Sequence, residues 1–381
     1  MGLRKSAALL AGVALALTSL AACGNETKND ATPTGGATGA TGAVNPDAGD
    51  TLVGITMPTV SLERWNNDGS ELKAKLEAMG YKTSLEYGND LPEQQILQIE
   101  NQINAGAKIL VIASIDGSSL GTTVAKAKAA GITVIGYDRL LLQTGDIDYY
   151  ATFDNYRVGQ MQGEYIVEAL DLENAAGPFN FEPFAGSPDD NNAGLFFKGA
   201  WDVLSPYVDS GKLVIQSETG KKATGNWQDI GILSWKSATA QSEMENRLNS
   251  FYRDKKVDVV LSPNDSLALG IAQALETGGY TVGGDWPVLT GQDGDIANVK
   301  NILAGKQSMT VWKDTRDLAA AVADMVDQIA KGETVTVNDT TTYDTGVKVV
   351  PTYQLDPKVV TKDTVETELV GSGFIDAADL Q

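Results

Sequence analysis

The fold of this chain is decided by one stretch, Gly131-Ile132-Thr133-Val134-Ile135-Gly136-Tyr137-Asp138-Arg139. A run with strand character leads there directly into an acid and a base. In an open parallel sheet, ligands bind beyond the carboxyl ends of the strands, where the chain leaves the core. A strand that ends in Asp138-Arg139 is therefore a candidate recognition edge. A single such strand is also consistent with an exposed loop and a local ion pair, since charged loop residues are usually solvated.

Other apolar runs of strand length alternate with helical patterns on both sides of this stretch. The run at 108–113 is continuously apolar, as strands buried on both faces are. Alternation of this kind predicts an α/β fold with doubly wound parallel sheets, and two successive β-α runs indicate two similar lobes. We expect the tail after 351 to be irregular. One more extended segment is expected at 345–351. The predicted strands lie at 52–57, 82–87, 108–113, 131–137, 177–185, 212–216, 257–261, 287–291 and 308–312.

The first 50 residues do not have the composition of a folded domain. A basic start, an apolar stretch and small residues before Cys23 form an export signal over residues 1–22. Leu20-Ala21-Ala22-Cys23 resembles the lipobox of bacterial lipoproteins, which implies cleavage before Cys23 and its acylation. Residues 23–50 are mostly Asn, Thr, Gly, Ala, Asp and Pro, a composition typical of a flexible tether. An extracytoplasmic protein held to the membrane by lipid is expected, with an ordinary secreted protein as the alternative.

Composition excludes several kinds of chemistry. The chain has no histidine and one cysteine, which removes Ser-His-Asp and Cys-His catalysis and most zinc sites. The formal net charge of −21 repels nucleic acid phosphates and anionic lipid headgroups. No acidic stretch has the spacing of a calcium-binding EF-hand loop. We therefore expect no nucleic acid partner, no cofactor and no metal.

The predicted strands end in side chains of similar chemistry. Carboxylates, amides, long cations and tryptophans occur at seven sites, six that follow a predicted strand and one near residue 234, which is far harder to explain by chance than one pair. Each sugar hydroxyl both donates and accepts hydrogen bonds, so an acid and a base together suit it. The apolar C–H face of a pyranose ring suits a tryptophan ring. The seven segments are 61–65, 138–139, 186–192, 234–236, 262–265, 291–293 and 312–314.

Simpler explanations exist for two of these features. Trp65 and Trp235 could each be ordinary core residues. Asp and Asn are strong helix N-caps, so the run 189–192 could cap a helix, and we expect one or two of its four residues to do so. Asp116 is interpreted as the cap of a helix that follows it and ends at Ala130.

The order of these motifs resembles the sugar-binding proteins of bacterial ABC importers, over residues 51–372. The class most similar is the xylose, glucose and multiple-monosaccharide receptors, which are related to the ribose-binding proteins. The resemblance implies the fold of a type I periplasmic binding protein, a monomer that encloses one pentose or hexose and delivers it to a membrane permease. The motifs are Met57-Pro58-Thr59, Arg64-Trp65, Tyr137-Asp138-Arg139, Thr152-Phe153-Asp154-Asn155, Gly186-Ser187-Pro188-Asp189-Asp190-Asn191-Asn192-Ala193, Thr290-Gly291-Gln292-Asp293 and Lys313-Asp314-Thr315-Arg316.

Site residues are carried over on these motifs. Arg139 and Asp265 are expected behind the ligating acids, where they would orient them. The segment 219–232 matches no motif, which leaves the choice of sugar open. The sugar contacts that the resemblance implies are Arg64, Asp138, Asp190, Asn192, Trp235, Asn264, Asp293 and Lys313, with Trp65 as the second stacking face.

The resemblance also implies lobe boundaries and three hinge crossings. Residues 51–153 plus 314–344 would form the N-terminal lobe, and residues 154–313 plus 345–381 the C-terminal lobe. The crossings would fall near 153–155, 312–314 and 343–347.

Two other functions compete with the transport receptor. Asp138, Asp190 and Asp293 could supply the carboxylate pair of a glycoside hydrolase. Such an enzyme needs a groove for a glycosidic chain, whereas two matched lobes indicate enclosure, so we expect no enzyme. A chemosensory receptor for a sugar or a sugar-like signal would need the same lobe surface, and the sequence does not separate it from a transport receptor.

Overall fold

A computed structural model describes residues 48–381. The predicted signal segment 1–22, Cys23 and nearly all of the tether 23–50 lie outside the described residues. Within the described part, no helix has both the length and the apolar character needed to span a bilayer.

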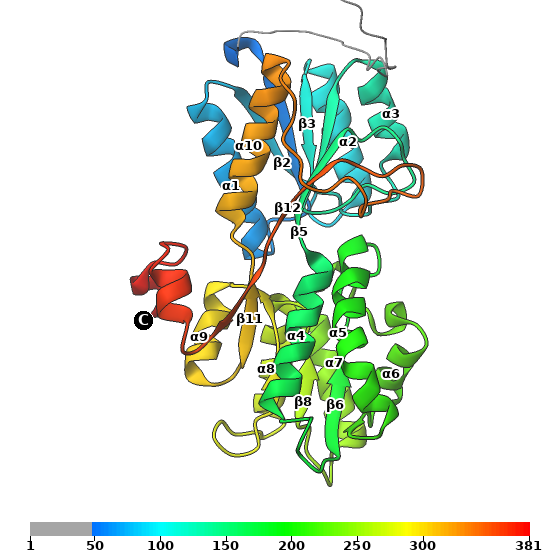
Figure 1. Cartoon of the computed structure of the whole chain (residues 1–381), viewed down its shortest axis with the longest axis vertical. Helices are drawn as coiled ribbons and strands as arrows, with labels where there is room; N and C mark the ends of the chain where they lie inside the picture. The colour runs from blue at the N-terminus through cyan, green and yellow to red at the C-terminus, as the bar shows by residue number, and fades with distance from the viewer. Residues whose placement is uncertain (1–47) are drawn as a thin grey trace, which may run out of the picture. The chain divides into compact units, whose positions relative to one another are not determined.

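The first sheet is parallel throughout. Its strands run in the order β12-β5-β4-β3-β1-β2, with each neighbouring pair in parallel register (Figure 1). Parallel neighbours need crossover connections, and helices provide them. The strands are β1 (Leu52–Met57), β2 (Lys82–Tyr87), β3 (Ile109–Ile112), β4 (Thr133–Tyr137), β5 (Tyr149–Phe153) and β12 (Thr352–Leu355).

Helices cover both faces of this sheet. Val111 of β3 lies in one core with residues of α1 (Glu63–Ala78) and α10 (Thr315–Lys331). Leu110, its neighbour, lies in a different core with residues of α2 (Pro92–Asn104) and α3 (Gly121–Ala129). Successive side chains of a strand point to opposite faces, so the continuous apolar run of β3 serves both cores.

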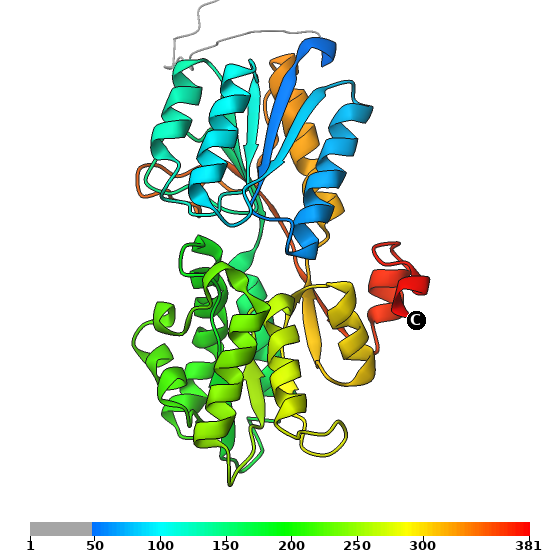
Figure 2. The same ribbon diagram turned by 180° about the vertical axis from the view of Figure 1, so that it is seen from behind.

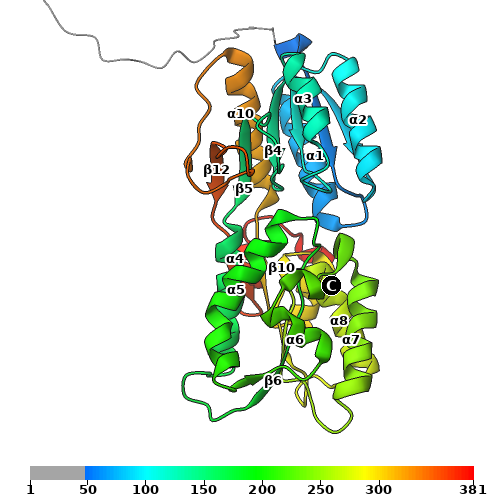
Figure 3. The ribbon, with the colours of Figure 1, turned by 90° about the vertical axis from the view of Figure 1, so that its right-hand side faces the viewer.

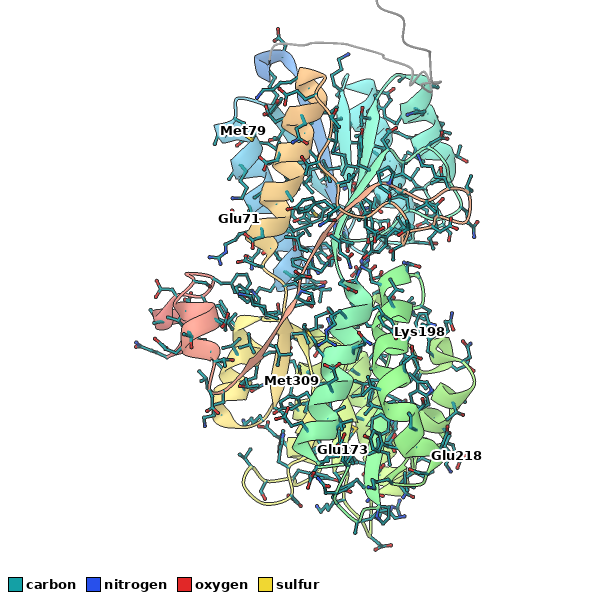
Figure 4. All side chains as sticks on the ribbon, viewed as in Figure 1. Glu71, Met79, Glu173, Lys198, Glu218 and Met309 are labelled. Carbon is teal, nitrogen blue, oxygen red and sulfur yellow. The ribbon has the colours of Figure 1, made fainter. Side chains whose placement is uncertain are left out.

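The second group of strands forms two smaller sheets. One has the order β7-β6-β8-β9 and is parallel, while in the other β11 pairs in parallel with β10 and in antiparallel with β13. Met309 of β11, labelled in Figure 4, is buried in the core of this group. The strands are β6 (Phe179–Pro183), β7 (Leu213–Val214), β8 (Val259–Leu261), β9 (Val288–Leu289), β10 (Gln292–Asp293), β11 (Met309–Trp312) and β13 (Lys358–Thr361).

Pairs of helices cover both faces of the sheet β7-β6-β8-β9. Phe181 and Val259 share a core with α4 and α5, whereas Val260 faces a core with α7 and α8. Figures 2 and 3 show these pairs from behind and from the side. The segment 219–232, which matched no motif, consists of short helical turns. The helices are α4 (Asn155–Ala169), α5 (Asn191–Asp209), α6 (Glu218–Lys221), α7 (Ser237–Phe251), α8 (Asp265–Thr277) and α9 (Ile296–Ala304).

Three sequence predictions about local structure are wrong. The tail after 351 is not irregular throughout, because residues 352–355 form β12 and residues 358–361 form β13. Residues 345–351 are not one extended segment, because polar side chains fold their first part into a turn. Gly346 donates its N–H to Asp344 Oδ1 at 2.8 Å and adopts φ 85°. Asp116 does not cap a helix, because α3 begins only at Gly121. Its Oδ1 instead accepts the N–H of Ser118 at 2.8 Å within the preceding turn.

The predicted third crossing at 343–347 is also wrong. β12 pairs in parallel with β5 of the first sheet, whereas β13 pairs with β11 of the second group. The chain therefore passes between the two groups after Leu355 and before Lys358, and residues 352–355 belong with the first sheet rather than with the second lobe. Strand pairing between distant segments decides this crossing, and local sequence carries no signal for it.

Two glycines hold α4 and α5 close together. A Cβ on Gly159 would lie 2.0 Å from the carbonyl oxygen of Phe196, and one on Gly199 would lie 2.1 Å from that of Tyr156. Backbone approaches of this kind leave no room for any side chain. The spacing of α5 from α4 therefore depends on both glycines.

We predict that Gly199→Ala lowers the free energy of unfolding by about 1–3 kcal/mol, because the methyl group must push the two helices apart. Urea unfolding followed by circular dichroism measures this. Gly121→Ala is the matched control, since its nearest neighbour would be 4.0 Å away. Equal stability of the two variants would contradict the close packing of α4 on α5.

Candidate ligand cavity

The first sheet supplies four of the predicted site residues. Arg64 and Trp65 lie in the first turn of α1, directly after the loop that follows β1, and Asp138 and Arg139 follow β4. Asp138 has φ 57°, a left-handed conformation that non-glycine residues rarely adopt. Its carbonyl oxygen accepts hydrogen bonds from the hydroxyls of Tyr150 at 2.5 Å and Thr152 at 3.1 Å. These bonds fix the turn that aims the Asp138 carboxylate.

The second group of strands and its helices supply the other predicted site residues, and two of these residues also cap helices. Asp190 Oδ1 accepts the N–H of Asn192 at 2.9 Å at the start of α5, and Asn264 Oδ1 accepts that of Leu267 at 3.1 Å at the start of α8. The capping alternative is therefore correct for Asp190, which still faces the cavity with its other oxygen. Capping and exposure to a cavity coincide here because helices that follow parallel strands begin at the carboxyl edge of the sheet.

All of these residues line a single cavity. About 300 Å³ of space between them is not filled by atoms, part of it open to solvent. Asp265 does not line the cavity. The lining consists of Leu62, Arg64, Trp65, Asp138, Arg139, Asp190, Asn192, Phe196, Trp235, Asn264, Gln292, Asp293 and Lys313.

Three lining residues were not predicted. Phe196 lies on α5 one turn after Asn192, so helical spacing would have placed both on one face. Gln292 directly precedes Asp293 in the short strand β10. Leu62 is the residue before α1 and carried no signal, because a lone leucine in a loop is unremarkable.

Charges in the cavity are buried and balanced. Arg64 Nη2 donates to Asp138 Oδ2 at 3.1 Å, and Arg64 Nη1 lies 3.6 Å from Asp293 Oδ1. Lys313 Nζ lies 3.4 Å from Asp293 Oδ1 and 3.8 Å from Asp138 Oδ2. With Arg139 and Asp190 the lining holds three cations and three carboxylates. A neutral ligand would leave this balance unchanged.

The carboxylates of Asp138 and Asp190 differ in their surroundings. Burial acts to raise the pKa of Asp138, but Arg64, Lys313 and Arg139 outweigh it and hold the pKa below its usual value. Burial raises the pKa of Asp190, and Arg139 offsets it only in part. Asp190 Oδ2 forms an ion pair with Arg139 Nε at 2.9 Å and accepts the N–H of Trp235 at 3.2 Å. Of these two carboxylates, Asp138 is therefore the one more firmly held in its charged form.

Several buried polar atoms of the lining have no hydrogen-bond partner among the described residues. Three are acceptors, Asn192 Oδ1, Gln292 Oε1 and Asp293 Oδ1, and one is a donor, Trp65 Nε1. An unsatisfied buried polar group costs about 1–3 kcal/mol. A ligand rich in hydroxyl groups could satisfy acceptors and donor together.

Both tryptophans combine core packing with a place in the lining. Trp65 belongs to the core below the first sheet, and its ring lies 4.2 Å from the guanidinium carbon of Arg64. Trp235 packs its ring edge-on to Phe196, with centroids 6.2 Å apart. Trp235 has φ 53°, and Asp293 has φ 111°. Such conformations cost about 1–3 kcal/mol each and cluster at ligand clamps.

Asp265 supports the cavity from behind. It is fully buried, and its carboxylate accepts the N–H groups of Gly294 at 2.9 Å and Asp295 at 3.0 Å. Gln307 Nε2 at 2.8 Å and Thr310 Oγ1 at 3.1 Å also donate to it. Asp265 thus holds the backbone next to Asp293, whereas Arg139, predicted for a similar place, reaches the cavity itself.

Comparison with known proteins gives a consistent set of relatives. Residues 53–334 match the periplasmic binding protein domain family. The chain is 50% identical over 330 residues to the multiple sugar-binding periplasmic receptor ChvE of Rhizobium radiobacter, covering 86% of this chain and 92% of that one. It is 35% identical over 333 residues to the D-xylose-binding periplasmic protein of Escherichia coli K12, covering 87% and 93%.

A solved structure is similar over the same length. The ABC transporter solute binding protein from Clostridium phytofermentans, with bound β-D-glucose, has a TM-score of 0.82 and 49% sequence identity to this chain. The match covers 87% of this chain and 100% of that one.

Proposed function

This chain belongs to the periplasmic binding protein family, and we propose that it encloses one aldose, a pentose or a hexose, and delivers it to an ABC permease. Its fold is the two-lobed α/β fold of type I that the sequence predicted. The prediction that it is a binding protein and not an enzyme is confirmed by the same relatives. The names of these relatives refer to multiple sugars, to D-xylose and to bound β-D-glucose, which supports an aldose as the ligand.

The observation that carries this proposal is the chemistry of the cavity lining. Acidic and basic side chains alternate along the lining, with Arg64 between Asp138 and Asp293. One sugar hydroxyl can therefore accept a hydrogen bond from a cation and donate its own O–H to a carboxylate. The rings of Trp65 and Trp235 supply apolar surface for the C–H faces of the sugar. A neutral, hydroxyl-rich ring of small size meets all of these demands.

Closure of the two lobes would form the site. Arg139 after β4 pairs with Asp190 before α5, and Asn192 Nδ2 donates to the carbonyl oxygen of Asp138 at 2.8 Å. Each contact joins a residue that follows the first sheet to a residue of the second group. We propose that the sugar stabilises this closed arrangement, which the permease then recognises. The crossings at 153–155, 312–314 and 355–358 would act as the hinge.

The proposed lobes follow from the strand pairing. Residues 51–153, 314–355 and their helices would move as one body, and residues 154–313 with 358–381 as the other. Only the third boundary differs from the division predicted from the sequence.

A calorimetric titration of the purified protein tests the proposal. The protein is first unfolded and refolded to strip any sugar it carries, and then titrated with glucose, galactose, xylose, arabinose, ribose and fucose. We expect binding of at least one aldose with a Kd of about 1 μM or tighter, roughly −8 kcal/mol. No heat with any of the six sugars would refute an aldose receptor.

Two substitutions test the site. We predict that Asp138→Ala and Trp235→Ala each weaken binding of the preferred aldose at least about 100-fold, because each removes a buried contact that water cannot replace. Asp254→Ala, at an exposed position outside the cavity, is the control and should bind as the unsubstituted protein does. Thermal unfolding without sugar shows whether each variant is folded. Retained affinity in both cavity variants would refute the site.

We further propose that Cys23 carries the lipid anchor. The support is the sequence around it, since this residue lies outside the described part of the chain. The predicted result for Cys23→Ser is loss of acylation and release of the protein from the membrane fraction, because no other thioether-linked chain would hold it. Fractionation of cells with immunoblotting measures this. Equal membrane retention of the substituted and unsubstituted chains would contradict the anchor.

A further inference from the structure

Asp68 lies directly behind the cavity and was not predicted as a site residue. It is on α1, one turn after Arg64, and it is fully buried without lining the cavity. Its carboxylate accepts three hydrogen bonds. Arg64 Nε donates to Oδ2 at 3.1 Å, Arg64 Nη2 donates to Oδ1 at 3.3 Å, and the Tyr137 hydroxyl donates to Oδ1 at 2.5 Å.

Arg64 depends on these bonds for its orientation. Two of its three nitrogens face Asp68, and this leaves Nη1 directed at Asp293 and Nη2 shared with Asp138. A free arginine side chain has several rotatable bonds, and fixing it costs about 1.5–2 kcal/mol of conformational entropy. A bidentate carboxylate on the same helix fixes the plane of the guanidinium group before any ligand arrives.

Asp68 is in turn fixed by the first sheet. Tyr137 ends β4 and immediately precedes Asp138, so the residue that anchors Asp68 is joined to the residue that Arg64 contacts. The contacts form a closed ring from Tyr137 through Asp68 and Arg64 to Asp138. The charge of the cavity lining is already balanced without Asp68, so neutrality of the lining does not explain its burial.

From this ring we infer that Asp68 is a positioning residue for sugar binding, which acts by holding the Arg64 guanidinium toward Asp138 and Asp293 and never touches the sugar. The inference rests on the proposed function, because it assigns Asp68 to the same cavity. It predicts that substitution of Asp68 weakens sugar binding only when Arg64 is present.

A double-mutant cycle measures this dependence. Asp68→Asn keeps the size of the side chain but removes its charge and one acceptor. We expect it to weaken binding of the preferred aldose about 10- to 100-fold, the range found for outer partners of metal ligands. In an Arg64→Ala background the same change should alter affinity less than about threefold. NMR titration to millimolar sugar keeps the weak variants measurable.

A second double-mutant cycle keeps the inference testable if Asp68→Asn folds poorly. Tyr137→Phe removes one donor to Asp68 and leaves its carboxylate and Arg64 in place, so a loss of several-fold is expected, again only when Arg64 is present. Glu182→Gln is the matched control. Glu182 is also fully buried and paired to an arginine, Arg247, but it lies in the other group of strands, so its substitution should lower stability and leave affinity unchanged.

The outcomes are distinct. Losses that disappear in the Arg64→Ala background support the inference. Losses of the same size in both backgrounds overturn it, because Asp68 would then affect binding by a route other than Arg64. No loss of affinity at all also overturns it and leaves Asp68 a role in stability alone. If the unsubstituted protein binds no aldose, the proposed function fails, and this inference fails with it.

Discussion

Much of this structure depends on the requirement that each buried charge has a partner of opposite charge. Placing a carboxylate or an ammonium group in a low-dielectric interior costs several kcal/mol unless a partner and hydrogen bonds accompany it. The cavity meets this demand by alternating Asp138, Arg64, Asp293 and Lys313, with distances of 3.1 to 3.8 Å between oppositely charged atoms. The pairs are not fully hydrogen-bonded among themselves, and the remaining bonds are open to a ligand that can both donate and accept.

Parallel strands bring these charges together from distant parts of the sequence. Arg64 follows β1, Asp138 follows β4, and Asp293 and Lys313 come from the small sheet of β10 and β11. Each segment leaves its sheet at the carboxyl edge, where the backbone must turn sharply. Asp138, Trp235 and Asp293 make these turns with positive φ values. The strain is tolerated because the surrounding bonds, such as those from Tyr150 and Thr152 to the Asp138 carbonyl, fix the turns.

Packing of the helices positions further residues of the cavity lining. α5 carries Asn192 and Phe196 in the lining, and it can lie against α4 only because Gly159 and Gly199 have no side chains. α1 carries Arg64 and Trp65, and the buried Asp68 one turn later ties that helix to Tyr137 of β4. Helix caps contribute in the same way, since the Asp190 and Asn264 side chains fix the first turns of α5 and α8 at the cavity edge.

The amino-acid sequence by itself determined the alternation of strands and helices and the polar residues that follow each strand. These depend on local patterns. The nine lining residues from Arg64 to Lys313 were named in advance from the resemblance of those motifs to the sugar-binding proteins. Tertiary structure alone decided the pairing of β12 with β5, the entry of Gln292 into the lining, and the bond from the Tyr137 hydroxyl to Asp68. Pairing and side-chain direction there are set by contacts between residues far apart in the chain, and no local pattern encodes them.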